Sequence, residues 1–539
     1  MQLLKVAASL ALLLTASPAL AGKPDKSGTR DFAKRQWKSH MHLQGWERHP
    51  VFHSNATTGN ATFEQYIDHK NPDLGTFSQL YFWSTEFWGG PGSPIVIFTP
   101  GEVAASGYTG YLTNRTTTGV VAQKIGAAVI IVEHRYWGQS SPVDVLSTKN
   151  MQYLTLENSI SDLNHFAQTV RLPFDPRRAS RPQKAPWVLM GGSYSGALSA
   201  WTASTQPGTF WAYHASSAPV QAISDYWQYF VPVQEGMPQN CSKDVSLVVD
   251  HVDAVFHNGT ADEQYALKAM FGLGDLEHYD DFAAALENGP WLWQGNQFYL
   301  NSGFFYFCDA VENATPNGTV PGAEGVGLEK ALAGYASWFN TTMLPGFCAS
   351  YGYADWQGQY SIGCFDTYNA SSPQYTDMSL SNGFDRQWTW FLCNEPFGYW
   401  QDGAPSDRPS IVSRLVDAQY WIRQCPLSFP PEDGYTFGIA KGETEDEVNS
   451  YTKGWDIAHP RLLYVNGDYD PWREASVSSE FRDGGKLAST ADHPVVIVPG
   501  GFHTSDLLTR NAQSNAGAAT AIDAVVAQLK AWVDEFPKK

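Results

Sequence analysis

Two serines separated by one residue, Ser193 and Ser195, lie in the stretch WVLMGGSYSGAL at 187–198. A nucleophilic serine sits at a tight turn from strand to helix, where small residues two positions away let the backbones approach. Ser193 follows a short apolar run, with Gly191 two positions before it and the small Ser195 two positions after it. Ser195 would instead lie inside the helix. The pattern favours Ser193 as nucleophile over the alternative of a Gly-Ser turn that only caps a helix.

A serine hydroxyl is a poor nucleophile unless a general base activates it, and the base needs an orienting carboxylate. Apolar runs at 461–467 and 493–501 are followed by Asp468 and Asp470 and by His503, respectively. In α/β-hydrolases the order along the chain is serine, acid, histidine, with each residue just past a strand. The order and placement fit this arrangement, and the spacing alone leaves the choice between the two aspartates open.

Short apolar runs bounded by glycine or proline predict the strands that position these residues. Three such runs lie in the first half of the chain, at 93–101, 126–138 and 185–192. Because they are continuous rather than alternating, they indicate a sheet that is covered on both faces. An apolar helical face between the second and third run predicts a parallel crossover; its residues are Leu156, Ile160, Leu163, Ala167 and Val170. A closing helix is predicted from Ile522, Val525, Leu529, Trp532 and Phe536.

The chain of 539 residues, 43% hydrophobic and 14% aromatic, is long enough for two domains or for one domain with a large insertion. The region 225–440 is irregular, rich in aromatic residues and contains every cysteine. We therefore expect an α/β-hydrolase fold formed by 47–224 and 441–539. A large, mainly helical or irregular, disulfide-braced insertion at 225–440 is expected to interrupt it.

The first residues have the pattern of a secretory signal. Lys5 precedes an apolar run, and small residues end at Ala21, so we expect a signal peptide at 1–21 that is too short to serve as a membrane anchor. The basic segment 22–46 contains the dibasic pair Lys34-Arg35, and it is interpreted either as a removed propeptide or as a flexible mature N-terminus. The expected localisation is extracellular.

Cysteines and sequons agree with secretion. An even number of cysteines predicts disulfides, with 15 connectivities if all six pair, and no C-x-x-C spacing suggests zinc, so no metal is expected. The cysteines are Cys241, Cys308, Cys348, Cys364, Cys393 and Cys425. The glycosylation sequons are at Asn55, Asn60, Asn114, Asn240, Asn258, Asn313, Asn317, Asn340 and Asn369.

The charge of the chain limits its partners. A formal net charge of −19 and a pI of about 5.1 argue against nucleic acid. No apolar run after the signal segment reaches the length of a membrane span, so no membrane partner is expected. The oligomeric state is not predicted.

Five motifs together resemble one peptidase family: GGSYSGAL, EHRYWGQSSP, QYLTLENSISDL, NGDYDPW and GGFHTSDL. The chain is similar, from about Thr62 to its C-terminus, to the serine peptidases that include lysosomal Pro-Xaa carboxypeptidase and dipeptidyl peptidase II. The resemblance extends most to their secreted fungal branch, the acid prolyl endoproteases. It implies Ser193 as nucleophile, Asp470 rather than Asp468 as the orienting acid, His503 as base, and no cofactor. Many members have glycine where Ser195 stands and cysteine where this chain has Thr504.

Residues around the predicted triad suggest how the reaction is assisted. The oxyanion hole is expected to combine the Tyr194 amide with an amide from the TPGEV loop, near Gly101 or Glu102. Arg135 is expected to brace the site by ion pairing rather than to react.

The resemblance implies cleavage after proline in a compact apolar pocket. Candidate pocket residues are Trp472 and Tyr194, with Trp390 and Glu395 from the insertion, although ordinary core packing explains such aromatic residues equally well. The predicted function is an acid-active prolyl endoprotease acting on proline-containing peptides or proteins.

Three alternatives differ in mode or class. The enzyme could be a Pro-Xaa carboxypeptidase or a dipeptidyl peptidase, since the sequence does not decide between internal and terminal cleavage. A lipase or esterase shares the fold but would lack the NGDYDPW motif. An inactive hydrolase-like binding protein would be marked by loss of a triad residue, and all three candidates are present.

Overall fold

The computed structural model describes residues 57–313 and 320–537 of the chain. The predicted signal peptide at 1–21, the segment 22–46 and the sequons at Asn55 and Asn317 lie outside these residues. In the described part, no helix is both long and apolar enough to cross a membrane.

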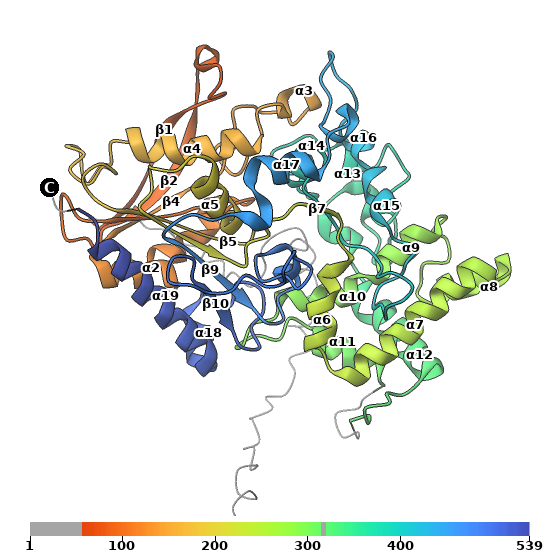
Figure 1. Ribbon diagram of the computed structural model, residues 1–539. Helices are drawn as coiled ribbons and strands as arrows, with labels where there is room; N and C mark the ends of the chain where they lie inside the picture. Colours follow the sequence, from red (N-terminus) through yellow and green to blue (C-terminus); the bar gives the residue numbers. More distant parts are fainter. Residues whose placement is uncertain (1–56, 314–319, 538–539) are drawn as a thin grey trace, which may run out of the picture.

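An eight-stranded sheet forms the centre of the hydrolase part (Figure 1). Its strand order is β1-β2-β4-β3-β5-β6-β9-β10, and only β2 runs antiparallel to its neighbours. The strands are β1 (Thr58–Tyr66), β2 (Thr76–Ser84), β3 (Ile95–Phe98), β4 (Ala128–Val132), β5 (Trp187–Gly192), β6 (Ala212–Ser216), β9 (Leu462–Gly467) and β10 (Val495–Val498). All five runs that the sequence predicted as strands form β3, β4, β5, β9 and β10, whereas β1, β2 and β6 were not predicted.

Helices cover both faces of the sheet, as the continuous apolar strands require. On one face, α4 (Leu156–Thr169) and α5 (Tyr194–Thr205) pack with alternate residues of the strands. On the other face, α2 (Thr117–Ile125) and α19 (Ala516–Asp534) pack with the remaining strand residues, next to α18 (Thr509–Ser514). In Figure 1, α4 lies above the sheet and the blue α19 below it. The two predicted helices correspond to α4 and α19.

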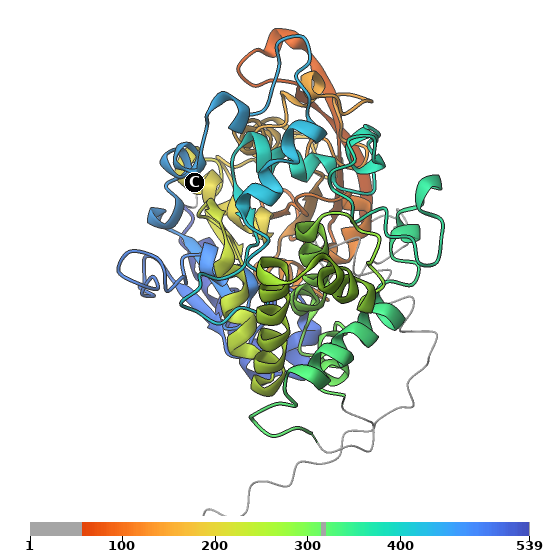
Figure 2. The ribbon, with the colours of Figure 1, turned by 90° about the vertical axis from the view of Figure 1, so that its right-hand side faces the viewer.

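The chain between β6 and β9 forms a mainly helical insertion, which lies to the right of the sheet in Figure 1 and in front of it in Figure 2. It begins with β7 (Ile223–Asp225), which pairs in parallel with β8 (Gly398–Trp400). Its helices are α6 (Phe230–Gly236), α7 (Gln239–Asn258), α8 (Ala261–Met270), α9 (Tyr279–Leu286), α10 (Asn288–Trp291), α11 (Phe304–Val311), α12 (Leu328–Trp338), α13 (Pro373–Thr376), α14 (Arg386–Asn394), α15 (Ala418–Ile422) and α16 (Cys425–Ser428), followed by α17 (Glu445–Thr452). One apolar core runs without interruption from the α4–α5 face of the sheet into the insertion.

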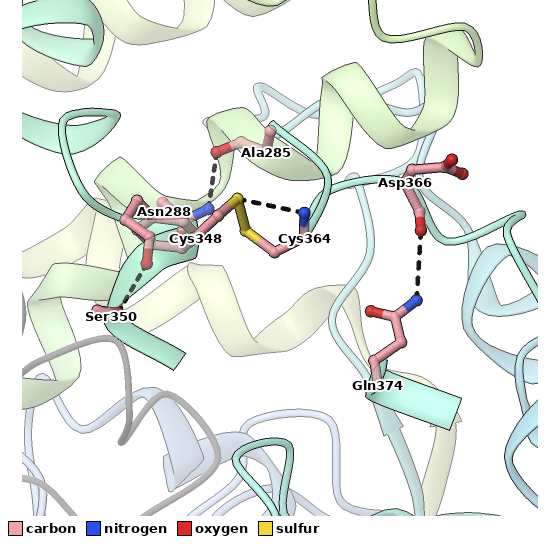
Figure 3. The surroundings of a disulfide bond; sticks show 8 residues. Ala285, Asn288, Cys348, Ser350, Cys364, Asp366 and Gln374 are labelled. Carbon is pink, nitrogen blue, oxygen red and sulfur yellow. Dashed lines mark hydrogen bonds between the residues drawn. A yellow bond between two sulfur atoms is a disulfide. The ribbon is translucent and has the colours of Figure 1, made fainter. Parts of the chain in front are cut away.

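All six cysteines are paired, and each bridge lies inside the insertion. The disulfides are Cys241–Cys308, Cys348–Cys364 and Cys393–Cys425. None joins the insertion to the sheet, as the sequence predicted. Figure 3 shows the second bridge beside Asn288 of α10, whose side chain donates to the carbonyl of Ala285 (2.8 Å).

Candidate active site

Ser193 occupies the turn between β5 and α5 in a strained backbone conformation, with φ 58° and ψ −132°. Its amide donates to Ser216 O at the end of β6 (2.9 Å), which holds the turn against the sheet. A Cβ at Gly191 would lie 2.0 Å from the carbonyl oxygen of Ser195, so only glycine fits there. The sequence pattern therefore corresponds to a real steric requirement, and the turn presents Ser193 at the carboxyl edge of the sheet.

Ser195 has a different environment. It lies in the first turn of α5, has no exposed surface, and its Oγ donates to the carbonyl of Gly192 (3.0 Å). A Cβ on Gly101, whose φ is 77°, would lie 2.9 Å from this Oγ. Ser195 thus packs against the TPGEV loop and fills a small space. Ser193, by contrast, lines a cavity.

Asp470 and His503 form a buried pair without exposed surface. His503 Nδ1 lies 2.9 Å from Asp470 Oδ1, an oxygen that also accepts the Trp472 amide at the start of η10 (Pro471–Ala475; 3.0 Å). Asp468 is engaged elsewhere, because its Oδ2 accepts the amide of Gly500 (3.0 Å). The geometry thus makes Asp470, and not Asp468, the partner of His503, a choice that spacing alone left open.

The end of β6 brings the serine turn and the histidine loop to one place. Ser216 accepts the amide of Ser193, and the next residue, Ser217, accepts the amide of Thr504 through its Oγ (2.8 Å). Within the described chain, His503 Nε2 has no hydrogen-bond partner, and no hydrogen bond joins it to the Ser193 hydroxyl. Such a contact is often long in an unliganded site and tightens when substrate binds.

A second histidine–carboxylate–serine set lies beneath the site and has a different role. His214 Nε2 lies 2.9 Å from Asp506 Oδ2, and the Ser216 hydroxyl donates to the other oxygen of Asp506. None of the three has more than 1% of its surface exposed. They cannot reach a substrate, and they join β6 to the loop after His503.

The insertion holds the two loops that carry the acid and the base. A short 3-10 helix, η4 (Leu292–Gly295), follows α10. Trp293 Nε1 donates to the carbonyl of Tyr469 (2.8 Å), and Gln297 Nε2 donates to the carbonyl of His503 (2.7 Å). These contacts were not predictable from the sequence, since the segment has no periodic pattern.

A cavity of about 240 Å³ opens onto Ser193. Its walls are aromatic and come from both parts of the chain, and the predicted Tyr194, Trp472 and Glu102 are among them. Aromatic lining residues that were not predicted from the sequence include Trp291, Trp388, Tyr399, Trp400 and Trp421. Cys364, Asn288 and Ala285 of Figure 3 line the same cavity. No lysine or arginine is found among its lining residues, all of which belong to the described chain.

The prediction that Trp390 lines the substrate cavity is wrong. On α14, Trp388 and Leu392 face the cavity, and Trp390 lies on the opposite side of the helix. Its indole donates to the carbonyl of Leu154 (2.9 Å) and packs edge-on against Phe429. The helical spacing of Trp388 and Leu392 was the signal that could have distinguished the two tryptophans.

The prediction that Glu395 lines this cavity is also wrong. Glu395 follows the end of α14 and lies in a separate polar hollow with Asn158 and Lys441. Burial raises the pKa of its carboxyl to about 7.

Glu102 places a carboxyl with a perturbed pKa on the wall of the cavity that Ser193 also lines. Only 3% of its surface is exposed, and burial raises its pKa to about 8. The Gly101 amide donates to Thr99 Oγ1 (3.4 Å). The Glu102 amide faces its own carboxyl, so neither predicted position is singled out as the second oxyanion donor.

His134 and Arg135 are buried residues that stabilise the surroundings of the site through hydrogen bonds and an ion pair. His134 Nδ1 lies 2.8 Å from the carbonyl of Arg135, so Nε2 is the acceptor for the Tyr194 hydroxyl (3.0 Å). Burial lowers the pKa of His134 to about 4. Arg135 forms two hydrogen bonds with the Asp162 carboxylate, of 2.5 and 2.7 Å, and donates to the carbonyls of Tyr66, Ile67 and Tyr153. Arg135 therefore braces the fold as predicted.

The strand order with a single antiparallel strand, together with the strained serine turn after β5, defines an α/β-hydrolase. The family model for serine carboxypeptidase S28 matches residues 65–288 and 350–520. The chain belongs to this family and is a serine-type peptidase. In the described residues no cluster of three or more histidine, cysteine or acidic side chains is arranged to hold a metal ion.

Individual relatives agree with the family. Serine protease vicPa of Bipolaris victoriae is 45% identical over 483 residues, which is 89% of either chain. A probable extracellular serine carboxypeptidase of Arthroderma benhamiae is 31% identical, over 79% of this chain and 59% of that protein. Among solved structures, an arylesterase has a TM-score of 0.34 with 10% identity, covering 95% of this chain and 92% of its own, a similarity too low to bear on the argument.

Proposed function

We propose that the chain is a secreted, acid-active prolyl endoprotease that cleaves peptide bonds on the carboxyl side of proline. The observation that carries this proposal is the aromatic-walled cavity that opens onto Ser193. Flat rings of Trp388, Tyr399 and Trp472 suit the compact apolar ring of proline, which fills such a space without leaving a polar group unpaired.

The proposed mechanism uses Ser193, His503 and Asp470. The imidazole Nδ1–H donates to Asp470, so the neutral ring has its Nε2 lone pair free to take the proton from the Ser193 hydroxyl. The serine oxygen attacks the carbonyl carbon of the proline residue, and His503 then gives the proton to the leaving amine of the next residue. Water hydrolyses the acyl-enzyme by the same route.

The developing oxyanion needs donors that are already in place. The Tyr194 amide is at the first position of α5, where helical amides lack an intrahelical acceptor. The proposed second donor is the amide of Gly101 or of Glu102, on the loop that packs against α5.

The proposed preference for acid rests on the resemblance to the acid prolyl endoproteases, and the alkaline limit is proposed to come from the Glu102 carboxyl. With a pKa of about 8 it is neutral in acid and ionises in mild alkali. An ionised carboxylate on the wall of this cavity would oppose the negative charge that forms on the substrate carbonyl oxygen, and would slow acylation. We therefore propose that kcat/KM declines as the pH rises through this pKa.

Internal cleavage is favoured over release of a C-terminal residue. A Pro-Xaa carboxypeptidase must hold a free carboxylate, and neither lysine nor arginine lines the described cavity. Three acids line it, namely Glu102, Asp281 and Asp385. A dipeptidyl peptidase, which must hold a terminal amine, is the second candidate because of these acids.

Export through the secretory pathway is supported by the leader at 1–21, by the three disulfides and by the extracellular relative. The sequons whose asparagine is exposed in the structure are proposed glycosylation sites: Asn60, Asn114, Asn258, Asn313 and Asn369. Asn240 and Asn340 are half-buried, so we propose that these two are modified less.

A peptide blocked at both ends, with one internal proline, tests the proposal. Mass mapping of the products at pH 4 to 7 should show one cut after proline, and none when alanine replaces it; Ser193→Ala is the control. If only a peptide with a free carboxyl end is cut, the enzyme is a carboxypeptidase. If only a peptide with a free amino end is cut, it is a dipeptidyl peptidase. Hydrolysis of fatty esters without peptide cleavage would indicate an esterase, and absence of both an inactive protein.

A further inference from the structure

Gln294, in η4 of the insertion, lines the same cavity as Ser193. Its Oε1 accepts two hydrogen bonds, one from the Tyr229 hydroxyl (2.7 Å) and one from the Trp472 indole (3.0 Å). An indole nitrogen can only donate, so the atom that faces it must be the amide oxygen. The orientation of the amide is thereby fixed, and the remaining atom is the donor, Nε2.

The Nε2 donor has no partner within the described chain, although only 7% of the Gln294 surface is exposed. The Nε2 atom is not fully buried, and it retains solvent access on the side of the cavity. Both lone pairs of Oε1 are occupied, which prevents the amide from flipping to satisfy Nε2 in another way. The result is a fixed N–H donor on the wall of the cavity.

We propose that Gln294 Nε2 binds a carbonyl oxygen of the peptide backbone held in this cavity. The inference rests on the proposed function insofar as the ligand is a peptide placed for attack by Ser193. A carbonyl is preferred to a terminal carboxylate, because three acids line the cavity and would repel an anion when they are ionised. Gln294 is thus a specificity-determining residue supplied by the insertion.

The Gln294→Glu variant tests the donor. One carboxyl oxygen can still accept from Tyr229 and Trp472, while the other replaces the N–H donor. At neutral pH, kcat/KM on an amino-blocked proline amide should fall roughly tenfold to a hundredfold, mostly through KM, since an unpaired buried acceptor costs about 1–3 kcal/mol. As the pH falls, the carboxyl gains a proton, donates again, and the ratio to wild type should recover.

A matched control is Gln401→Glu, because Gln401 lines the same cavity and its side chain has no hydrogen bond in the described structure. It adds the same charge without removing a fixed donor. Equal losses in the two variants, with no selective recovery at low pH for Gln294→Glu, would overturn the proposal. Should the charged variant not fold, Gln294→Met keeps the size of the side chain and should show the loss without any recovery.

Two further measurements separate the outcomes. Labelling of Ser193 by a fluorophosphonate should be unchanged in Gln294→Glu, which shows that the nucleophile is intact. A loss seen only on peptides with a free C-terminal carboxylate would refute the carbonyl assignment. A wild-type enzyme that cleaves after another residue would contradict the proline proposal, and the Gln294 comparison would then be made on that substrate.

Discussion

The strained turn at Ser193 gives a stability difference that does not depend on activity. With φ 58° and ψ −132°, the backbone is in a region that glycine adopts freely and other residues rarely do. Strain of this kind costs on the order of 1–3 kcal/mol. Alanine at this position keeps the strain, whereas glycine releases it but loses about 0.5–1 kcal/mol to the greater freedom of the unfolded chain. Ser193→Gly should therefore be more stable than Ser193→Ala by about 1 kcal/mol, within a range of about 0–2.5 kcal/mol.

The neighbouring serine gives the matched comparison. Ser195→Ala removes the hydrogen bond to the Gly192 carbonyl (3.0 Å) and should cost about 1 kcal/mol of stability. Because its hydroxyl is not at the cavity, the variant should retain most of its turnover. Both variants at Ser193 should lose turnover by roughly 10⁴-fold or more.

The assays are urea unfolding of the four proteins and hydrolysis of a blocked proline amide. A glycine variant that is less stable than the alanine variant by about 0.5–1 kcal/mol would show that the turn is not strained in solution. Retained activity in Ser193→Ala with loss in Ser195→Ala would refute the choice of nucleophile.

Three other predictions follow from the surroundings of the site. An unfolded histidine binds a proton near pH 6.5, but His134 in the fold does so only near 4, so stability should fall as the pH drops between these values, by an amount on the order of 3 kcal/mol. His134→Gln should flatten that dependence, measured by urea midpoints from pH 4 to 7. Gln297→Leu removes the donor to the His503 carbonyl (2.7 Å) and should lower kcat about tenfold with little change in KM; an unchanged kcat would show that this contact does not position the base. Asp470→Asn should lower kcat by about 10⁴-fold and Asp468→Asn by less than tenfold, and the reverse ranking would contradict the assignment.

The catalytic face was predictable because its elements have strong local signals. Strands buried on both faces are continuous apolar runs, and the turn at Ser193 requires glycine at 191 for a steric reason. Strand β6, AYHAS, has no such run, because His214 and Ser216 are held in its interior by Asp506, a partner 290 residues or more away in sequence. A local pattern cannot show a polar strand that a distant carboxylate stabilises.

The cavity walls were less predictable, since they depend on how the insertion folds over the sheet. Trp388 and Trp390 are two residues apart, and only the orientation of α14 decides which of them faces Ser193. The six cysteines allowed 15 pairings, and the choice among them is a matter of tertiary distance. Gln294 and Gln297 lie in an irregular segment where neither helical nor strand periodicity gives a clue.

The Cys241–Cys308 disulfide closes a loop that contains η4, the segment whose Trp293 and Gln297 hold the acid and base loops. Fixing the two ends of this loop restricts the conformations through which η4 could leave those loops. We therefore expect the peptidase to mature only after oxidation. A chain still in a reducing compartment would have its sheet and its Ser193. The loops that carry Asp470 and His503 would not be held by the η4 segment. The bridge would then protect the producing cell, because the peptidase would remain inactive until the chain has left the cytosol.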